Sequence, residues 1–147
     1  MSSNIHILIK TISAPLDFVY DWCTDFREDD PELTGSNYTE KIIEKTKEKA
    51  VFTTETVKDG RLIHATETVD MHPPDHWHLD FIGDEADEIG DYNLTSEGSQ
   101  TKLTMKFEIT YKNPKFTTSK EEWEKSANEY WDKLIIEIGR ASCRERV

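Results

Sequence analysis

The sequence predicts an α+β domain in which one long C-terminal helix packs on a face of an antiparallel sheet. A strand and a helix come first, several strand-like segments follow without a helix between them, and a long amphipathic helix closes the pattern. Strands that run together before a helix are typical of α+β domains. The chain has 147 residues, which is enough for one domain that needs no disulfide or metal.

The N-terminal part is predicted to form the first strand and the first helix. Residues 5–12 are rich in β-branched side chains, which favour strands. Ser13 is a candidate N-cap, and Pro15 suits the first turn of a helix. Apolar side chains then recur at three- and four-residue steps, so residues 15–26 are predicted to be an amphipathic helix. Residues 27–35 are predicted to be a loop or a short helix.

The middle of the chain is predicted to form the sheet. Asp59-Gly60 is a strong signal for a two-residue hairpin, and it sets a register in which Glu55 faces His64. The acidic segment 83–90 is predicted to be a turn. The strands are expected over residues 38–47, 50–58, 61–71, 76–82, 91–96 and 101–111.

The last helix is predicted to begin after Ser119, which is placed to cap it. Trp123, Ala127, Tyr130 and Leu134 follow at steps of four, three and four residues. This spacing puts them on one stripe, so a helix is expected at least over residues 120–136.

The final segment, residues 138–147, differs from the helix before it because it is basic and has no apolar period. Back-translated with suitable codons, it reads as a common short-read sequencing adapter. We therefore predict one domain over residues 1–137 and a non-native tail over residues 138–147, in which Cys143 carries no function. A genuine C-terminus is the alternative, and an unbroken genomic reading frame would establish it.

The composition narrows the classes of partner. A formal net charge of −12 argues against nucleic acid and against anionic membranes, because both need clustered Lys and Arg. No apolar run approaches the roughly 18 residues of a membrane span, and no signal peptide is recognisable. We expect a cytoplasmic monomer or weak dimer without stable membrane insertion. Cys23 lies on an apolar helix stripe and is expected to be buried and unreactive.

Two segments resemble the START-like superfamily, also called SRPBCC, which includes the polyketide cyclase/dehydrase and lipid-transport group. Residues 12–22, ISAPLDFVYDW, resemble the opening strand-to-helix junction of that family, and residues 90–104 resemble its last hairpin. The resemblance covers nearly the whole predicted domain. It implies a helix-grip fold, in which about seven antiparallel strands wrap around the C-terminal helix and leave a cavity for apolar molecules. Some members are enzymes, and others only carry or sense ligands.

Large side chains on the predicted inward faces either pack as a core or line such a cavity. If they line a cavity, the expected ligand-binding residues are Trp22, Phe26, His64, Trp77, Phe81, Tyr92, Met105, Phe107, Trp123, Tyr130 and Trp131.

No catalytic motif is recognisable, and no metal or cofactor is expected. The weak acid–base candidates are His64, Tyr92 and Asp91, and a surface pair with Glu55 is the alternative interpretation of His64. The histidines near Pro73-Pro74 are expected on a solvated face. The acidic runs 28–30 and 84–88 lack the spacing of a calcium loop.

Three functions remain open. The leading hypothesis is binding or carriage of an apolar small molecule of lipid, polyketide or aromatic type, without catalysis. The second is a polyketide cyclase/dehydratase-like enzyme with acid–base residues in the cavity. The third is a protein-interaction module that resembles activators of heat-shock-chaperone ATPases and would carry an exposed apolar patch. A closed cavity on the order of a few hundred Å³ would favour the first two.

Overall fold

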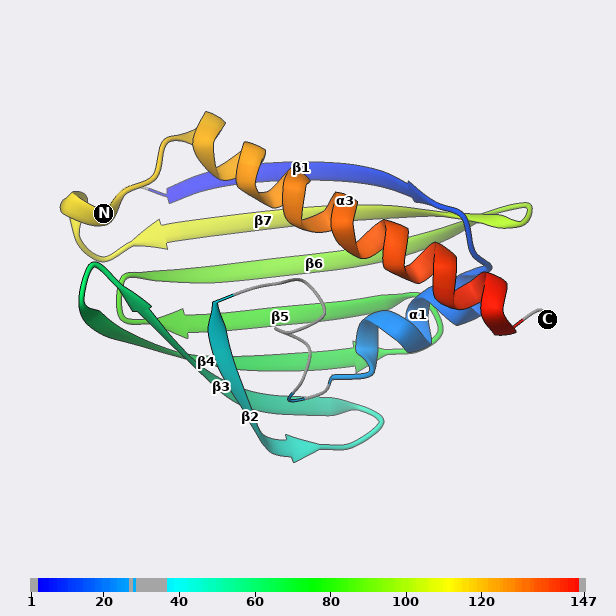
Figure 1. Ribbon diagram of the computed structural model, residues 1–147, viewed down its shortest axis with the longest axis horizontal. Coiled ribbons are helices and arrows are strands. Elements are labelled where there is room, and N and C mark those ends of the chain that lie inside the picture. The colour runs from blue at the N-terminus through cyan, green and yellow to red at the C-terminus, as the bar shows by residue number, and fades with distance from the viewer. Residues whose placement is uncertain (1–2, 27, 29–36, 146–147) are drawn as a thin grey trace.

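The computed structural model describes residues 3–26, 28 and 37–145 (Figure 1). The elements follow the predicted order of strand, helix, strands and long helix. They are β1 (Ser3–Ile12), α1 (Leu16–Thr24), β2 (Tyr38–Lys45), β3 (Lys49–Lys58), β4 (Arg61–His72), β5 (His76–Gly83), β6 (Ala86–Glu97), β7 (Gln100–Tyr111), the 3₁₀ turn η1 (Pro114–Phe116) and α3 (Lys120–Glu145).

The strands form one seven-stranded antiparallel sheet in the order β1-β7-β6-β5-β4-β3-β2. Consecutive strands are neighbours except for β1, which pairs with β7 at the edge of the sheet. Helix α3 runs across one face of this sheet, and α1 lies beside its C-terminal half (Figure 1). The predicted α+β architecture is confirmed, and no helix in the described part of the chain is long and apolar enough to cross a membrane.

The β3–β4 hairpin has the predicted register, with Glu55 opposite His64. Its turn residues, Asp59 and Gly60, have φ angles of 52° and 76°. Positive φ at both central positions matches the twist of the flanking strands, which is why an Asp-Gly pair favours this turn.

Two local predictions are corrected. The segment 83–90 is mostly strand, because β6 begins at Ala86 and Glu88 pairs with Phe81 of β5. The apolar alternation of a strand is not visible in this segment, because the inward positions 88 and 90 of β6 carry a glutamate and a glycine. The N-cap of α1 is Pro15, which has no side-chain cap, rather than Ser13. Residues 27–35, predicted to be a loop or a short helix, lie outside the described residues except for Glu28.

The core lies between the sheet and the helices. Strand β7 alternates as predicted and buries every second side chain from Thr101 to Tyr111. The Thr101 hydroxyl donates a 2.7 Å hydrogen bond to the carbonyl of Ala14 and joins β7 to the turn after β1. Helix α3 begins under its predicted cap, since the backbone N–H of Glu122 donates to Ser119 Oγ at 3.2 Å.

Helix α3 continues through the segment predicted to be a non-native tail. Ile138 is fully buried against the core, and Ser142 is also buried. These contacts describe how the given sequence packs. The origin of residues 138–147 depends on the coding DNA and stays a prediction.

Candidate functional site

A cavity of about 470 Å³ lies between the sheet and the helices. Its walls come from α1, from β2 to β7 and from α3. Among the described residues, eleven aromatic side chains line it: Trp22, Phe26, Tyr38, Phe52, Trp77, Phe81, Tyr92, Phe107, Trp123, Tyr130 and Trp131.

Tyr92 is the centre of the aromatic wall. Its ring stacks on Trp77 with 4.9 Å between the centroids and meets Phe107 edge-on at 5.6 Å. Trp131 of α3 lies 6.0 Å from the same ring, so Tyr92 joins the sheet to the helix. Rings packed against one another in this way have few alternative rotamers, and the cavity wall is therefore well defined.

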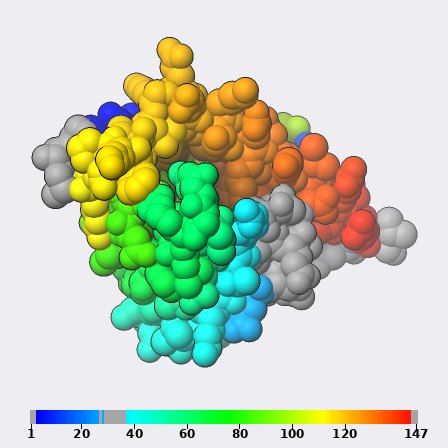
Figure 2. All heavy atoms as spheres, turned by 60° about the vertical axis from the view of Figure 1, so that its left-hand side comes forward, coloured from blue at the N-terminus to red at the C-terminus, as the bar shows by residue number. Residues whose placement is uncertain are grey.

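The cavity opens to solvent beside α3. Three of its lining residues, Asp25, Ser126 and Tyr130, are exposed. Figure 2 shows a hollow between the orange atoms of α3 and the green atoms of the β3–β4 hairpin. A small molecule could therefore reach the interior without unfolding of the sheet.

Two glutamates face the cavity from the middle of the sheet. Glu67 of β4 and Glu88 of β6 both lie opposite Phe81, which sits on the strand between them. Their Cα atoms are therefore about 10 Å apart, which is two strand spacings. Neither carboxyl group forms a hydrogen bond or an ion pair with any described residue. A third glutamate, Glu40 of β2, also lines the cavity.

Burial in this apolar space changes the acidity of the lining groups. Burial, followed by the negative charges of Glu40 and Glu88, raises the pKa of Glu67 from 4.5 to about 8. Burial raises the pKa of Glu88 to about 7. It also raises the pKa of Tyr92 well above 10 and that of the Cys23 thiol to about 12. At neutral pH the cavity thus holds a largely protonated Glu67, a half-ionised Glu88 and neutral Tyr92 and Cys23.

Solved structures share this architecture. The Zhui aromatase/cyclase from Streptomyces sp. R1128 superposes with a TM-score of 0.76 at 12% identity, over 99% of this chain and 97% of that one. Ara h 8.0201 gives a TM-score of 0.72 at 11% identity, over 97% and 99%. A START superfamily protein from Mycobacterium smegmatis gives 0.68 at 14%, over 95% and 97%.

The chain has the helix-grip fold. Its structural neighbours are START-like proteins, as the sequence resemblance implies. No protein-family model matches the sequence, and no curated protein matches it. Because the identities to the neighbours are low, the likeness establishes the fold, and the chemistry of the site has to be argued from the residues of this chain.

Most of the predicted ligand-binding residues line the helix-grip cavity. Met105 is buried in the core and is not part of the lining, and His64 is outside the cavity altogether. The residues in the lining are Trp22, Phe26, Trp77, Phe81, Tyr92, Phe107, Trp123, Tyr130 and Trp131. Their role in binding a ligand stays a prediction.

His64 is corrected to the outer face of β4, because inward positions on that strand are odd-numbered and residue 64 points the other way. Its backbone N–H donates to Asp84 Oδ2 at 2.7 Å, and its ring nitrogens lie 3.5 Å from carboxylate oxygens of Asp84 and Glu55. The surface pair with Glu55, which was the alternative interpretation, is therefore present.

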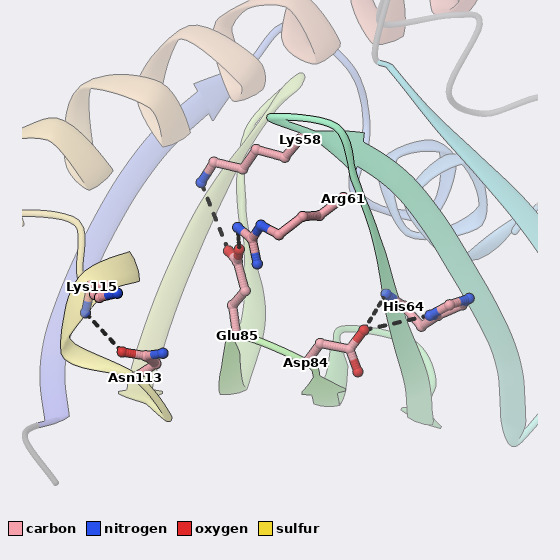
Figure 3. A network of polar contacts seen from close by, with 7 residues as sticks. All are labelled: Lys58, Arg61, His64, Asp84, Glu85, Asn113 and Lys115. Atoms are coloured by element: carbon pink, nitrogen blue, oxygen red, sulfur yellow. Dashed lines mark hydrogen bonds and ion pairs between the residues drawn. The ribbon is translucent and has the colours of Figure 1, made fainter.

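Figure 3 shows His64 with Asp84 and, beside them, a second ionic contact. In this second contact the Glu85 carboxylate lies 2.8 Å from Arg61 and 3.8 Å from Lys58. The Arg61 guanidinium also lies 4.1 Å from the centre of the Phe116 ring. The contacts of Arg61 thus join the β3–β4 hairpin to the β5–β6 turn and to η1.

Asp91 also points away from the cavity. Its Oδ1 lies 2.8 Å from His78 Nδ1 and 3.3 Å from His76 Nε2 on the outer face of the sheet. The hydrogen bond with Asp91 raises the pKa of His78. Of the three predicted acid–base candidates, only Tyr92 reaches the cavity. Within the described residues, no group of three or more His, Cys, Asp or Glu side chains is arranged to hold a metal ion.

Sequence reasoning missed the cavity glutamates, although a signal was present. Glu67 occupies an inward position between Ala65 and Val69 on β4, and Glu88 is in phase with Tyr92 on β6. A charged residue in the apolar phase of a half-buried strand is unusual, because burial of an unpaired charge is costly. That irregularity was the available indication of a site.

Proposed function

We propose that this protein binds an apolar, aromatic small molecule inside the helix-grip cavity. The observation that carries the proposal is the cavity itself, whose volume of about 470 Å³ falls within the usual range of ligand sites and whose walls are mostly aromatic. The neighbours named as an aromatase/cyclase and as a START superfamily protein support the same class of function.

All four tryptophans of the chain line the cavity, so intrinsic fluorescence reports directly on occupancy. The test is titration with the neutral probe N-phenyl-1-naphthylamine. We expect saturable quenching of tryptophan emission with a matching rise in probe emission.

The matched variants lie on α3. Ala127→Phe puts a ring into the cavity and should weaken binding at least about tenfold, which is the effect of losing roughly 1.4 kcal/mol of binding energy. Glu129→Phe adds the same ring at an exposed position and should leave binding unchanged. Unsaturable binding to the wild type, or equal affinity in the Ala127→Phe variant, would contradict the proposal.

A second candidate function is acid–base catalysis on a carbonyl compound. It is favoured by Glu67 and Glu88, whose pKa values of about 8 and 7 suit proton transfer at neutral pH. Paired carboxyl groups with perturbed pKa values in an apolar cleft are typical of catalytic sites, although they occur elsewhere. The cyclase/dehydratase hypothesis would thus depend on these glutamates and not on His64 or Asp91.

This candidate can be tested by the exchange of α-protons of 1-phenyl-1,3-butanedione in deuterium oxide, followed by NMR. We expect faster exchange than in buffer and a loss of about 10²- to 10⁴-fold in Glu67→Gln or Glu88→Gln. Glu108→Gln is the control, because Glu108 lies exposed on β7. Exchange at the buffer rate would remove the enzymatic candidate and leave the binding proposal standing.

A further inference from the structure

We infer that the cavity selects an apolar organic cation, a protonated amine carried on an aromatic or aliphatic body, over neutral or anionic molecules of the same shape. The inference rests on the proposed binding function and narrows it to one chemical class of ligand.

The first observation is the one-sided charge of the lining. Among the described residues, the acidic groups in the cavity wall are Asp25, Glu40, Glu67 and Glu88, and no Lys, Arg or His lines it. Asp25 already meets Lys45 Nζ at 3.1 Å at the rim. Glu67 and Glu88 lie deeper and form no hydrogen bond or ion pair with a described residue. An organic cation would supply the partner that these two carboxyl groups lack.

The second observation is independent of charge and concerns the rings. Trp77 and Tyr92 stack on each other in the wall, and Trp131 and Trp123 enclose the space from α3. Aromatic faces attract ammonium groups through their quadrupole, tryptophan most strongly, and the attraction grows when water is excluded. The same wall therefore accepts both the apolar body and the cationic head of such a ligand.

Other ligand charges fit this wall less well. An anionic molecule would lie among four acidic side chains, with no Lys, Arg or His among the described lining residues to balance its charge, and like charges in a poorly solvated site repel. A neutral molecule would supply no charge to Glu67 and Glu88, which form no ion pair with a described residue. Only a cation gains from both the carboxyl groups and the rings.

A cation would bind the ionised form of a glutamate, so its affinity should rise with pH. A partner with a pKa of about 7 to 8 is about 10 to 50 times more ionised at pH 8 than at pH 6. The other titratable groups that face Glu67 and Glu88 across the cavity are Cys23, Asp25, Tyr38, Glu40, Tyr92 and Tyr130. None of these is cationic, so none would compete with the amine.

The test uses three probes with one ring system: 1-naphthylmethylamine, 1-naphthalenemethanol and 1-naphthoate. Their affinities are measured by isothermal titration calorimetry at pH 6 and pH 8. At pH 8 we expect the amine to bind at least about tenfold more tightly than the alcohol, and the naphthoate to bind most weakly. The preference for the amine should fall by about 10- to 50-fold at pH 6. Titrations in two buffers of different ionisation enthalpy should show proton release with the amine alone.

The variants separate charge from shape. Glu67→Gln and Glu88→Gln should each weaken the amine and spare the alcohol, whose retained binding shows that the variant is folded. Glu108→Gln removes one exposed carboxylate and should change neither the affinity for the amine nor the affinity for the alcohol. Equal affinity for alcohol and amine at pH 8 would overturn the inference and leave the proposed function intact. Failure of all three probes to bind would overturn both.

Discussion

Glu67 should make the protein less stable as the pH rises from 5 to 8. Its pKa is about 8 in the folded chain and 4.5 when exposed in the unfolded chain, so between these values the folded state holds the proton more tightly. Stability contributed by a group with a raised pKa is complete below the unfolded value and is lost as the pH approaches the folded value. For Glu67 the loss between pH 5 and pH 8 is about 3.5 kcal/mol.

The perturbation is Glu67→Gln, which keeps the shape of the side chain and removes its titration. The assay is urea unfolding at pH 5 and pH 8, followed by circular dichroism. From pH 5 to pH 8, the Glu67→Gln variant should lose about 3.5 kcal/mol less unfolding free energy than the wild type. The Glu88→Gln variant should lose about 2.5 kcal/mol less than the wild type, because the pKa of Glu88 is about 7. Glu108→Gln should follow the wild type. If Glu67→Gln and the wild type lose the same free energy, the cavity does not raise the pKa of Glu67 and the account of the site fails.

Two further predictions concern packing. Trp131→Ala should lower the free energy of unfolding by about 3–5 kcal/mol, since the residue is buried against Tyr92. Tyr130→Ala, at a residue that is 38% exposed, should cost less than half as much. A loss under about 1 kcal/mol for Trp131→Ala would mean that its ring is not part of the core. Gly83→Ala should cost about 1–3 kcal/mol, because its Cβ would lie 2.8 Å from the Phe81 ring and 2.9 Å from a backbone oxygen. Gly139→Ala meets nothing within 4 Å and should be neutral or stabilising, so equal losses at both glycines in thermal unfolding would refute the steric explanation.

Sequence patterns predicted the elements correctly where the structure depends on interactions between residues that are close in the chain, as in turns and helix caps. The Asp59-Gly60 turn requires positive φ angles, and it set the correct register for ten residue pairs between β3 and β4. Ser119 caps α3 as expected. The pattern failed over residues 86–90, where Glu88 and Gly90 occupy inward positions that are apolar in an ordinary strand. A strand that lines a polar part of a cavity does not show the alternation on which the prediction depends.

The site was predicted only in its apolar half. The aromatic residues were found because inward faces can be inferred from alternation and from helical spacing. His64 was misplaced because the register showed that it faces Glu55 but not which face of the hairpin is buried. The pair formed by Glu67 and Glu88 could not be inferred, since it requires β5 to lie between β4 and β6 with Phe81 opposite both.

The sequence alone thus determined the order of the elements, the turn chemistry and the set of rings available for an interior. These depend on propensities and periods that act within a few residues. The tertiary structure decided that the sheet and helices border a cavity of about 470 Å³ and that Glu67 and Glu88 share it without a hydrogen bond or ion pair to a described residue. The pKa values of the cavity carboxyl groups rise because residues distant in sequence come together and exclude water. A pattern of neighbouring residues in the sequence does not show which distant residues will meet.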